Sequence, residues 1–109
     1  MLAEDPLAFI KECIRAGRIY WTYHVNMRFA ERPITRDAIL GAVSTFEVIE
    51  EYPEDKYLPS YLVRAVHDER VFHLVVATDV KQRNVRVVTA YVPDEREWDN
   101  SLRTRRSST

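Results

Sequence analysis

Apolar residues in the first third of the chain recur at helical spacing. Asp5 suits a helix N-cap, Pro6 suits the first turn, and Gly17 suits a C-terminal stop. Between them, residues three and four apart predict one apolar helix face: Leu7, Ile10, Cys13 and Ile14. Residues 18–21 then predict an edge strand or an extended connector, because Ile, Tyr and Trp favour a half-buried strand.

Two further helices are predicted before residue 45. Thr22 is a candidate N-cap for a helix over residues 22–32, which Pro33 ends because proline disfavours helical geometry in the residue before it. Thr35 is a candidate cap for the next helix, and Asp37 lies in its first turn. Its apolar face would consist of Ala38, Ile39, Ala42 and Val43.

The second half of the chain has the pattern of strands. Four runs rich in β-branched and aromatic residues cover residues 46–52, 61–67, 71–78 and 85–92. Short polar turns favour antiparallel neighbours, so we expect an α+β domain with two or three N-terminal helices on a four-stranded antiparallel meander. The domain is expected to span residues 1–98, with Trp98 folded back onto it, and residues 99–109 are expected to form a flexible basic tail.

The strand over residues 71–78 has two faces that differ in polarity. The more apolar face is the better core face, and it carries Phe72, Leu74, Val76 and Thr78. His73 is therefore expected on the opposite surface, where it would meet Arg64 or Tyr91 if the strand register allows. A histidine among apolar strand residues is more often structural than functional.

Composition adds limits on class and location. The chain has 109 residues, of which 46% are hydrophobic and 30% charged, as expected for one globular domain. A single cysteine excludes an internal disulfide and favours a reducing, cytoplasmic setting. No apolar run approaches the roughly 20 residues that span a bilayer, so we expect no membrane association.

Charge is close to balanced overall but uneven along the chain. A net charge of −1 and a pI near 6.3 argue against a general nucleic-acid coat protein. Residues 45–70 carry seven acidic and three basic side chains, whereas residues 71–93 carry one acidic and three basic. A nucleic-acid contact would therefore be local, and the acidic region from Glu47 to Glu69 would suit a protein partner.

One histidine and two arginines, at intervals of four, form the main candidate for chemistry. On the predicted helix, His24, Arg28 and Arg32 would share one face. Histidine exchanges a proton near neutral pH, and arginine fits phosphate oxygens, so the set suits a phosphodiester. Arginines four apart more often belong to a solvated helix face, and a single histidine is most often structural.

Other sites are weakly supported by the sequence. The three histidines, at positions 24, 67 and 73, match no metal-ligand spacing, so no metal site is predicted. The chain also has no glycine-rich phosphate loop and no nucleophile elbow. We therefore expect no cofactor.

Several motifs together resemble a bacterial family called domain of unknown function 4258. They are His24-x-x-x-Arg28-x-x-x-Arg32-Pro33-Ile34-Thr35, the break Glu51-Tyr52-Pro53, FHLVVATD at 72–79 and VVTAYVPDEREW at 87–98. The resemblance covers about residues 18–98. It implies a fold grouped with RelE-, BrnT- and colicin-type nucleases, and a kinship with toxins of type II toxin–antitoxin pairs. By position, the family signature falls on His24, Arg28 and Arg32, with Thr89 and Tyr91 in the late strand motif.

The leading hypothesis is a metal-independent endoribonuclease that acts through the ribose 2′-hydroxyl. His24 would be the base, and Arg28 and Arg32 would hold the phosphate. The candidate substrate-binding residues on the strands are Arg64, His73, Thr89 and Tyr91. Expected partners are RNA, with or without the ribosome, and a cognate antitoxin protein.

Two alternatives remain open at this point. A non-catalytic protein-binding module would dock a partner through the acidic region or through the basic tail from Arg103 to Arg106. An RNA-binding protein would use the arginines without chemistry and would show salt-dependent binding.

Overall fold

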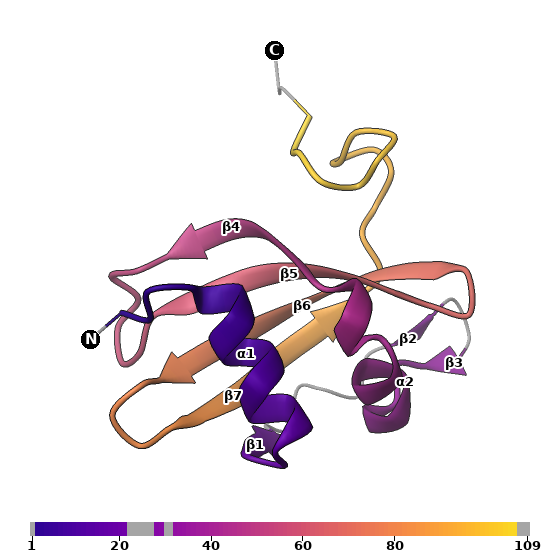
Figure 1. Cartoon of the computed structure of the whole chain (residues 1–109). Coiled ribbons are helices and arrows are strands. Elements are labelled where there is room, and N and C mark those ends of the chain that lie inside the picture. Colours follow the sequence, from indigo (N-terminus) through magenta and orange to yellow (C-terminus); the bar gives the residue numbers. More distant parts are fainter. Residues whose placement is uncertain (1, 22–27, 30–31, 107–109) are drawn as a thin grey trace.

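A five-stranded mixed sheet forms the centre of the molecule (Figure 1). The computed structural model describes residues 2–21, 28–29 and 32–106. The strand order is β1-β7-β6-β5-β4. The strands are β1 (Ile19–Trp21), β4 (Glu47–Tyr52), β5 (Ser60–His67), β6 (Arg70–Asp79) and β7 (Asn84–Tyr91).

The expected α+β class and the four-strand meander are confirmed, because β4, β5, β6 and β7 pair antiparallel in sequence order. The expectation of a purely antiparallel, four-stranded sheet is wrong. β1 adds a fifth strand, parallel to β7, and Ile19 pairs with Val85. The chain leaves the first helix beside the free edge of β7, and the amide of Val85 donates to the carbonyl of Arg18 at 3.1 Å. Of the predicted residues 18–21, Ile19–Trp21 therefore form an edge strand.

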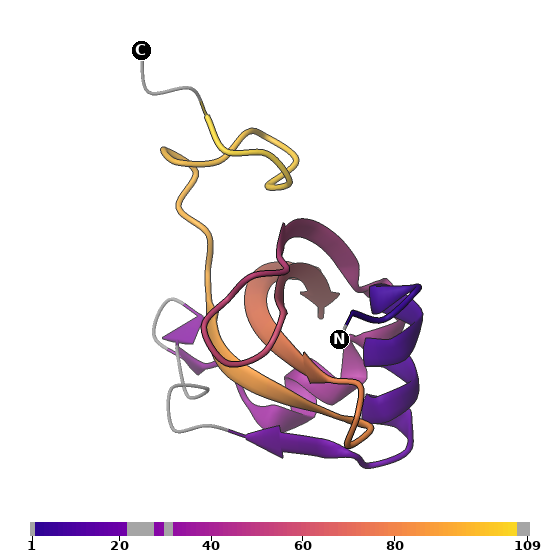
Figure 2. The same cartoon turned by 90° about the vertical axis from the view of Figure 1, so that its left-hand side faces the viewer.

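Both α-helices of the described residues lie on the same side of the sheet (Figures 1 and 2). The helix α1 (Pro6–Arg15) begins at Asp5, whose side chain accepts from the Ala8 amide. It ends at Gly17, which has a φ of 76° and so adopts a conformation that glycine tolerates best. The helix α2 (Arg36–Gly41) is capped by Thr35 as predicted, and a 3₁₀ turn, η2 (Val43–Thr45), follows it.

The predicted helix over residues 22–32 is wrong wherever the structure describes this segment. The strands β2 (Arg28–Phe29) and β3 (Arg32–Pro33) form a small antiparallel hairpin. Arg28 pairs with Pro33, and Phe29 pairs with Arg32. A short apolar run fits helical and strand periods almost equally, and proline is tolerated in such an edge strand. His24 lies outside the described residues.

The core fills the space between the helices and one face of the sheet. Phe72, Leu74 and Val76 are fully buried there, as the alternation on this strand predicted. The other core residues on the strands are Tyr61, Val63, Ala65, Val85, Val87 and Ala90, and α1 contributes Ile10, Cys13 and Ile14. The opposite face, which we call the open face, carries the alternate residues of each strand.

Residues 94–106, here called the strap, rise from the C-terminal end of β7 and form a loop beside β4 (Figure 1). The strap closes on itself through a bridge between Trp98 and Arg105 and a bond from the Arg106 amide to the Glu97 carbonyl. Trp98 is only 1% exposed, so the expectation that it folds back is confirmed. Residues 99–106 make hydrogen bonds to the sheet, described below, whereas the expected flexibility of this segment stays a prediction. No helix among the described residues is long and apolar enough to cross a bilayer.

Candidate functional site

A row of polar side chains crosses four strands of the open face. Glu47 on β4 pairs with Arg64 on β5, and Arg64 in turn pairs with His73 on β6. His73 pairs with Tyr91 on β7. Directly paired residues on neighbouring strands project from the same face, so these four side chains form one row. The register therefore brings His73 to both of the neighbours that the sequence suggested.

His73 is held by hydrogen bonds at both ring nitrogens. Its Nε2 lies 2.8 Å from the carbonyl oxygen of Leu102, and its Nδ1 lies 3.3 Å from the hydroxyl oxygen of Tyr91. A carbonyl only accepts, so Nε2 carries the proton and Nδ1 accepts from Tyr91. Burial lowers the pKa of His73, and the nearby charge of Arg64 lowers it further. The imidazole is therefore neutral at pH 7.

The expectation that His73 lies on a surface is wrong, because the strap covers it. His73 is fully buried, and the indole ring of Trp98 meets it edge-on at a centroid distance of 4.6 Å. Sequence alternation places His73 on the open face correctly, but it gives no sign that a segment about 25 residues later in the chain covers that face.

Arg64 also contacts the strap. Its Nε donates to the carbonyl oxygen of Ser101 at 3.0 Å. The carbonyl next along the strap, that of Leu102, is the one that accepts from His73. Two paired residues of β5 and β6 thus donate to two consecutive carbonyls of the strap.

Two arginines of the strap bind two glutamates of β4. Arg103 approaches Glu47 with N···O distances of 2.6 and 3.1 Å, and Arg105 approaches Glu50 with distances of 2.8 and 3.2 Å. The hydrogen bond from Arg103 lowers the pKa of Glu47. Burial alone would raise the pKa of Glu50, but hydrogen bonds from Arg105 and Tyr52 outweigh it and lower that pKa. Both glutamates are therefore ionised at neutral pH.

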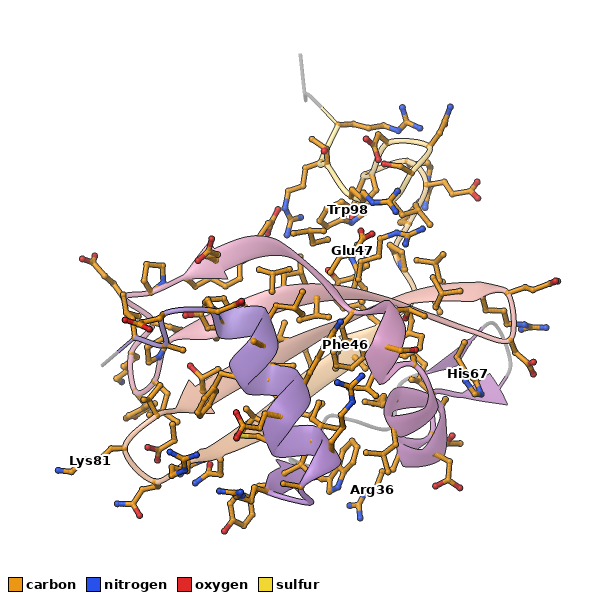
Figure 3. All side chains as sticks on the ribbon, in the orientation of Figure 1. Arg36, Phe46, Glu47, His67, Lys81 and Trp98 are labelled. Carbon is orange, nitrogen blue, oxygen red and sulfur yellow. The ribbon has the colours of Figure 1, made fainter. Side chains whose placement is uncertain are left out.

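The strap side chains stack onto the row. The guanidinium of Arg105 lies over the Trp98 ring, 4.6 Å from its centroid, and Trp98 in turn contacts His73. Trp98 and Glu47 lie where the strap meets β4 (Figure 3). These strap residues were not among the site residues predicted from the sequence. The signal in the sequence was a pair of arginines two residues apart, whose charge is opposite to that of the acidic residues of β4.

Tyr91 and Thr89 complete the candidate set on β7. Tyr91 is partly buried, and burial raises the pKa of its hydroxyl, which therefore stays protonated. Thr89 pairs with Val75, one step along the open face from His73. The structure thus brings Arg64, His73 and Tyr91 into contact range and places Thr89 beside them.

The arginine hairpin lies near the same end of the sheet. In both views the strands β2 and β3 lie close to the C-terminal end of β7, where Tyr91 is found (Figures 1 and 2). Arg28 and Arg32 occupy the two facing strands of this hairpin instead of successive helical turns. The predicted helical stripe is therefore replaced by a hairpin in which Arg28 and Arg32 belong to two neighbouring strand pairs, which alternate between the faces of the hairpin.

A shallow cavity of about 240 Å³ lies on the open face beyond the strap. Ser60 and Ala77, which pair across β5 and β6, belong to its lining. The exposed ring of Tyr57 and the guanidinium of Arg86 also line it. Among the described residues, no group of three or more His, Cys, Asp or Glu side chains is arranged to hold a metal ion.

A family model described as a domain of unknown function (DUF4258) matches residues 21–92. The matched range contains all four residues of the row and ends two residues before the strap. Comparison with curated proteins and with solved structures gave no match.

Proposed function

Because the chain belongs to the DUF4258 family, whose description names no activity, we propose from its own residues that it is a metal-independent endoribonuclease. The observation that supports this proposal is the position of the arginine hairpin, near the sheet end that carries Arg64, His73 and Tyr91. Guanidinium, imidazole and phenol groups are the side chains that bind a phosphodiester and move its protons.

The proposed reaction uses the ribose 2′-hydroxyl as the nucleophile. His24 takes the proton of this hydroxyl, whose oxygen attacks the adjacent phosphorus. The bond from phosphorus to the 5′ oxygen breaks, and that oxygen leaves with a proton from water; the hydroxide that remains takes the proton from His24, which restores the neutral imidazole. Arg28 and Arg32 offset the charge that builds up on the phosphoryl oxygens. The products are a 2′,3′-cyclic phosphate and a 5′-hydroxyl.

The strand residues would bind the RNA on either side of the reacting phosphate. Arg64 offers hydrogen-bond donors and Tyr91 offers its hydroxyl oxygen on the open face, and Thr89 extends this row toward the cavity. The exposed ring of Tyr57 at that cavity suits stacking of an unpaired base. This arrangement favours single-stranded RNA, whose bases are free to stack.

The test uses a DNA oligonucleotide that contains a single ribonucleotide, with EDTA present. Cleavage should occur 3′ of that ribonucleotide and leave a cyclic phosphate, and an all-DNA strand should stay intact. His24→Ala should lower the rate by about 10²-fold, as expected for loss of a general base. His67→Ala serves as the matched control, because the His67 ring lies against Gly41 of α2, on the helix side of the sheet. An unchanged rate for His24→Ala, or cleavage of the all-DNA strand, would contradict the mechanism.

Protein binding is the second candidate function, and a specific observation favours it. The edge strand β4 presents Glu47 and Glu50, and each binds an arginine of the strap at two points. An arginine-containing segment of an antitoxin or of a ribosomal protein would find the same two carboxylates. Expression of the wild-type chain should arrest bacterial growth if the chain is a toxin. Neighbouring genes can then be tested for rescue of growth, which would identify an antitoxin.

A further inference from the structure

We infer that the strap occupies a phosphate-binding site on the open face, so that RNA must displace residues 94–106 in order to bind. This inference rests on the proposed function, because it describes how access to the same site is controlled. The strap would act as an intramolecular cover, and its two central carbonyl oxygens would stand where phosphoryl oxygens of the RNA bind.

Arg64 and His73 both donate to the backbone of the strap. Their N–H groups donate to the carbonyl oxygens of Ser101 and Leu102, which are consecutive along the strap. A phosphodiester also presents two neighbouring acceptor oxygens, and it carries a negative charge that a carbonyl lacks. The Arg64 guanidinium is charged in both cases, so exchange of the neutral carbonyl for an anionic oxygen adds an attraction between opposite charges, and Arg64 should prefer the phosphate.

The backbone of the strap is strained at the residue that binds His73. Leu102 has a φ of 60°, in the left-handed region that a branched residue rarely adopts. The carbonyl of this residue is the one that binds His73. The strap therefore makes its central contact through a strained residue, and release of the strap would relieve that strain.

Two ion pairs that fasten the strap to β4 are in contact with solvent. The side chains of Arg103 and Glu47 are 44% and 43% exposed, and those of Arg105 and Glu50 are 55% and 24% exposed. Exposed ion pairs contribute little to stability, because water and salt compete for them. Burial of Trp98 is then the main contact that holds the strap on the sheet. The binding free energy of a highly charged ligand can offset the loss of this contact.

The test compares two double variants that lose the same charge. Arg103→Gln with Arg105→Gln removes the arginines that bind β4. The control, Arg96→Gln with Arg106→Gln, removes arginines whose partners belong to the strap itself: Asp94, Glu95 and Asn100. Both changes lower the positive charge by two, so electrostatics alone predicts weaker RNA binding in both.

If the strap covers the site, the two double variants should differ in their affinity for RNA. The Arg103/Arg105 variant should bind a 2′-O-methyl RNA, which cannot be cleaved, about three- to tenfold more tightly than the wild type, because the cover is easier to displace. The Arg96/Arg106 control should bind as the wild type does or more weakly. Arg64→Gln added to the first variant should abolish the gain. Glu47→Arg combined with Arg103→Glu should keep the cover in place and the affinity close to that of the wild type.

A second readout follows the strap directly. In a Trp21→Phe background Trp98 is the only tryptophan, and acrylamide quenching of its fluorescence reports its exposure. Saturation with the 2′-O-methyl RNA should raise this quenching, since the strap leaves the sheet. Unchanged quenching at saturation would overturn the inference, and so would RNA binding by the Arg103/Arg105 variant that is no tighter than that of the control.

These results separate the inference from the proposed nuclease activity. If RNA displaces the strap but neither the wild type nor the Arg103/Arg105 variant cleaves the single-ribonucleotide substrate, the cover is real and the nuclease proposal fails. If the substrate is cleaved while Trp98 stays protected, the nuclease proposal holds and the cover is wrong.

Discussion

The Nε2 atom of His73 lies 2.8 Å from the carbonyl oxygen of Leu102, 29 residues later in the chain. This bond, together with the one from the Tyr91 hydroxyl, uses both ring nitrogens of a fully buried imidazole. The folded chain therefore holds the neutral form of His73, whereas the unfolded chain leaves the ring free to protonate.

The stability of the fold should consequently fall in mildly acidic solution. The pKa of His73 is lowered in the folded state, so below about pH 6.5, its usual value, the unfolded chain binds more protons. The contribution of His73 to the free energy of unfolding is then fully present above pH 6.5, and it decreases as the pH falls toward the lowered pKa. Urea unfolding between pH 8 and pH 5 measures this loss.

A His73→Gln variant should lack the decrease, whereas His67→Gln should retain it. The charged groups around His73 change the pH range of this loss, because Arg64 and Arg105 lower the pKa of His73 and Glu50 raises it. Titration of Glu50 itself falls lower, because its pKa is lowered from an already acidic value. Parallel pH curves for the wild type and His73→Gln would rule out His73 as the source.

The hydroxyl of Tyr91 should contribute measurably to stability. Tyr91→Phe removes the donor to Nδ1 of His73 and leaves a buried acceptor without a partner. The expected loss in the free energy of unfolding is about 1 kcal/mol, at the low end for such a group because the bond is 3.3 Å long. Tyr20→Phe is the control, since Tyr20 is exposed, and it should change the free energy by less than about 0.5 kcal/mol. Equal effects would contradict the assigned bond.

Much of the sheet could be predicted from the sequence because its signals are local. Alternation in FHLVVATD placed Phe72, Leu74 and Val76 on the core face, and short polar turns fixed the antiparallel order. Asp5 and Thr35 were recognisable as caps because a capping side chain acts within three residues of itself. These features depend on spacing alone, so one sequence is enough to reveal them.

The missed features depend on contacts between distant segments. Nothing local distinguishes Arg28 and Arg32 on a helix from the same residues on a hairpin, because a run of six residues fits either period. The burial of His73 depends on Leu102 and Trp98, which belong to a segment without an apolar pattern. The sequence shows the opposite charges of β4 and the strap. Which arginine pairs with which glutamate depends on how the two segments lie in the folded chain.

Gly41 at the end of α2 offers a test of close packing against β5. A Cβ at this position would lie 3.0 Å from Cε1 and 3.1 Å from Nδ1 of His67, which lies beside α2 (Figure 3). Gly41→Ala should gain up to about 1 kcal/mol from helix propensity and lose most of it by displacing the imidazole. In a His67→Ala background the same change should show the full gain. A double-mutant cycle by thermal unfolding measures the difference, and additive effects would show that the two residues do not touch.

The thiol of Cys13 should be almost inert in the folded protein. Cys13 is 4% exposed on the buried face of α1, and burial raises the pKa of the thiol above its ordinary value. Only the thiolate reacts with a disulfide reagent such as DTNB, so both access and ionisation oppose modification. The reaction should be slow at pH 8 and should accelerate in urea along the unfolding curve. Val92→Cys in a Cys13→Ala background is the matched control, since Val92 is 42% exposed, and it should react within the mixing time. Fast modification of Cys13 without denaturant would show that α1 opens independently of the sheet.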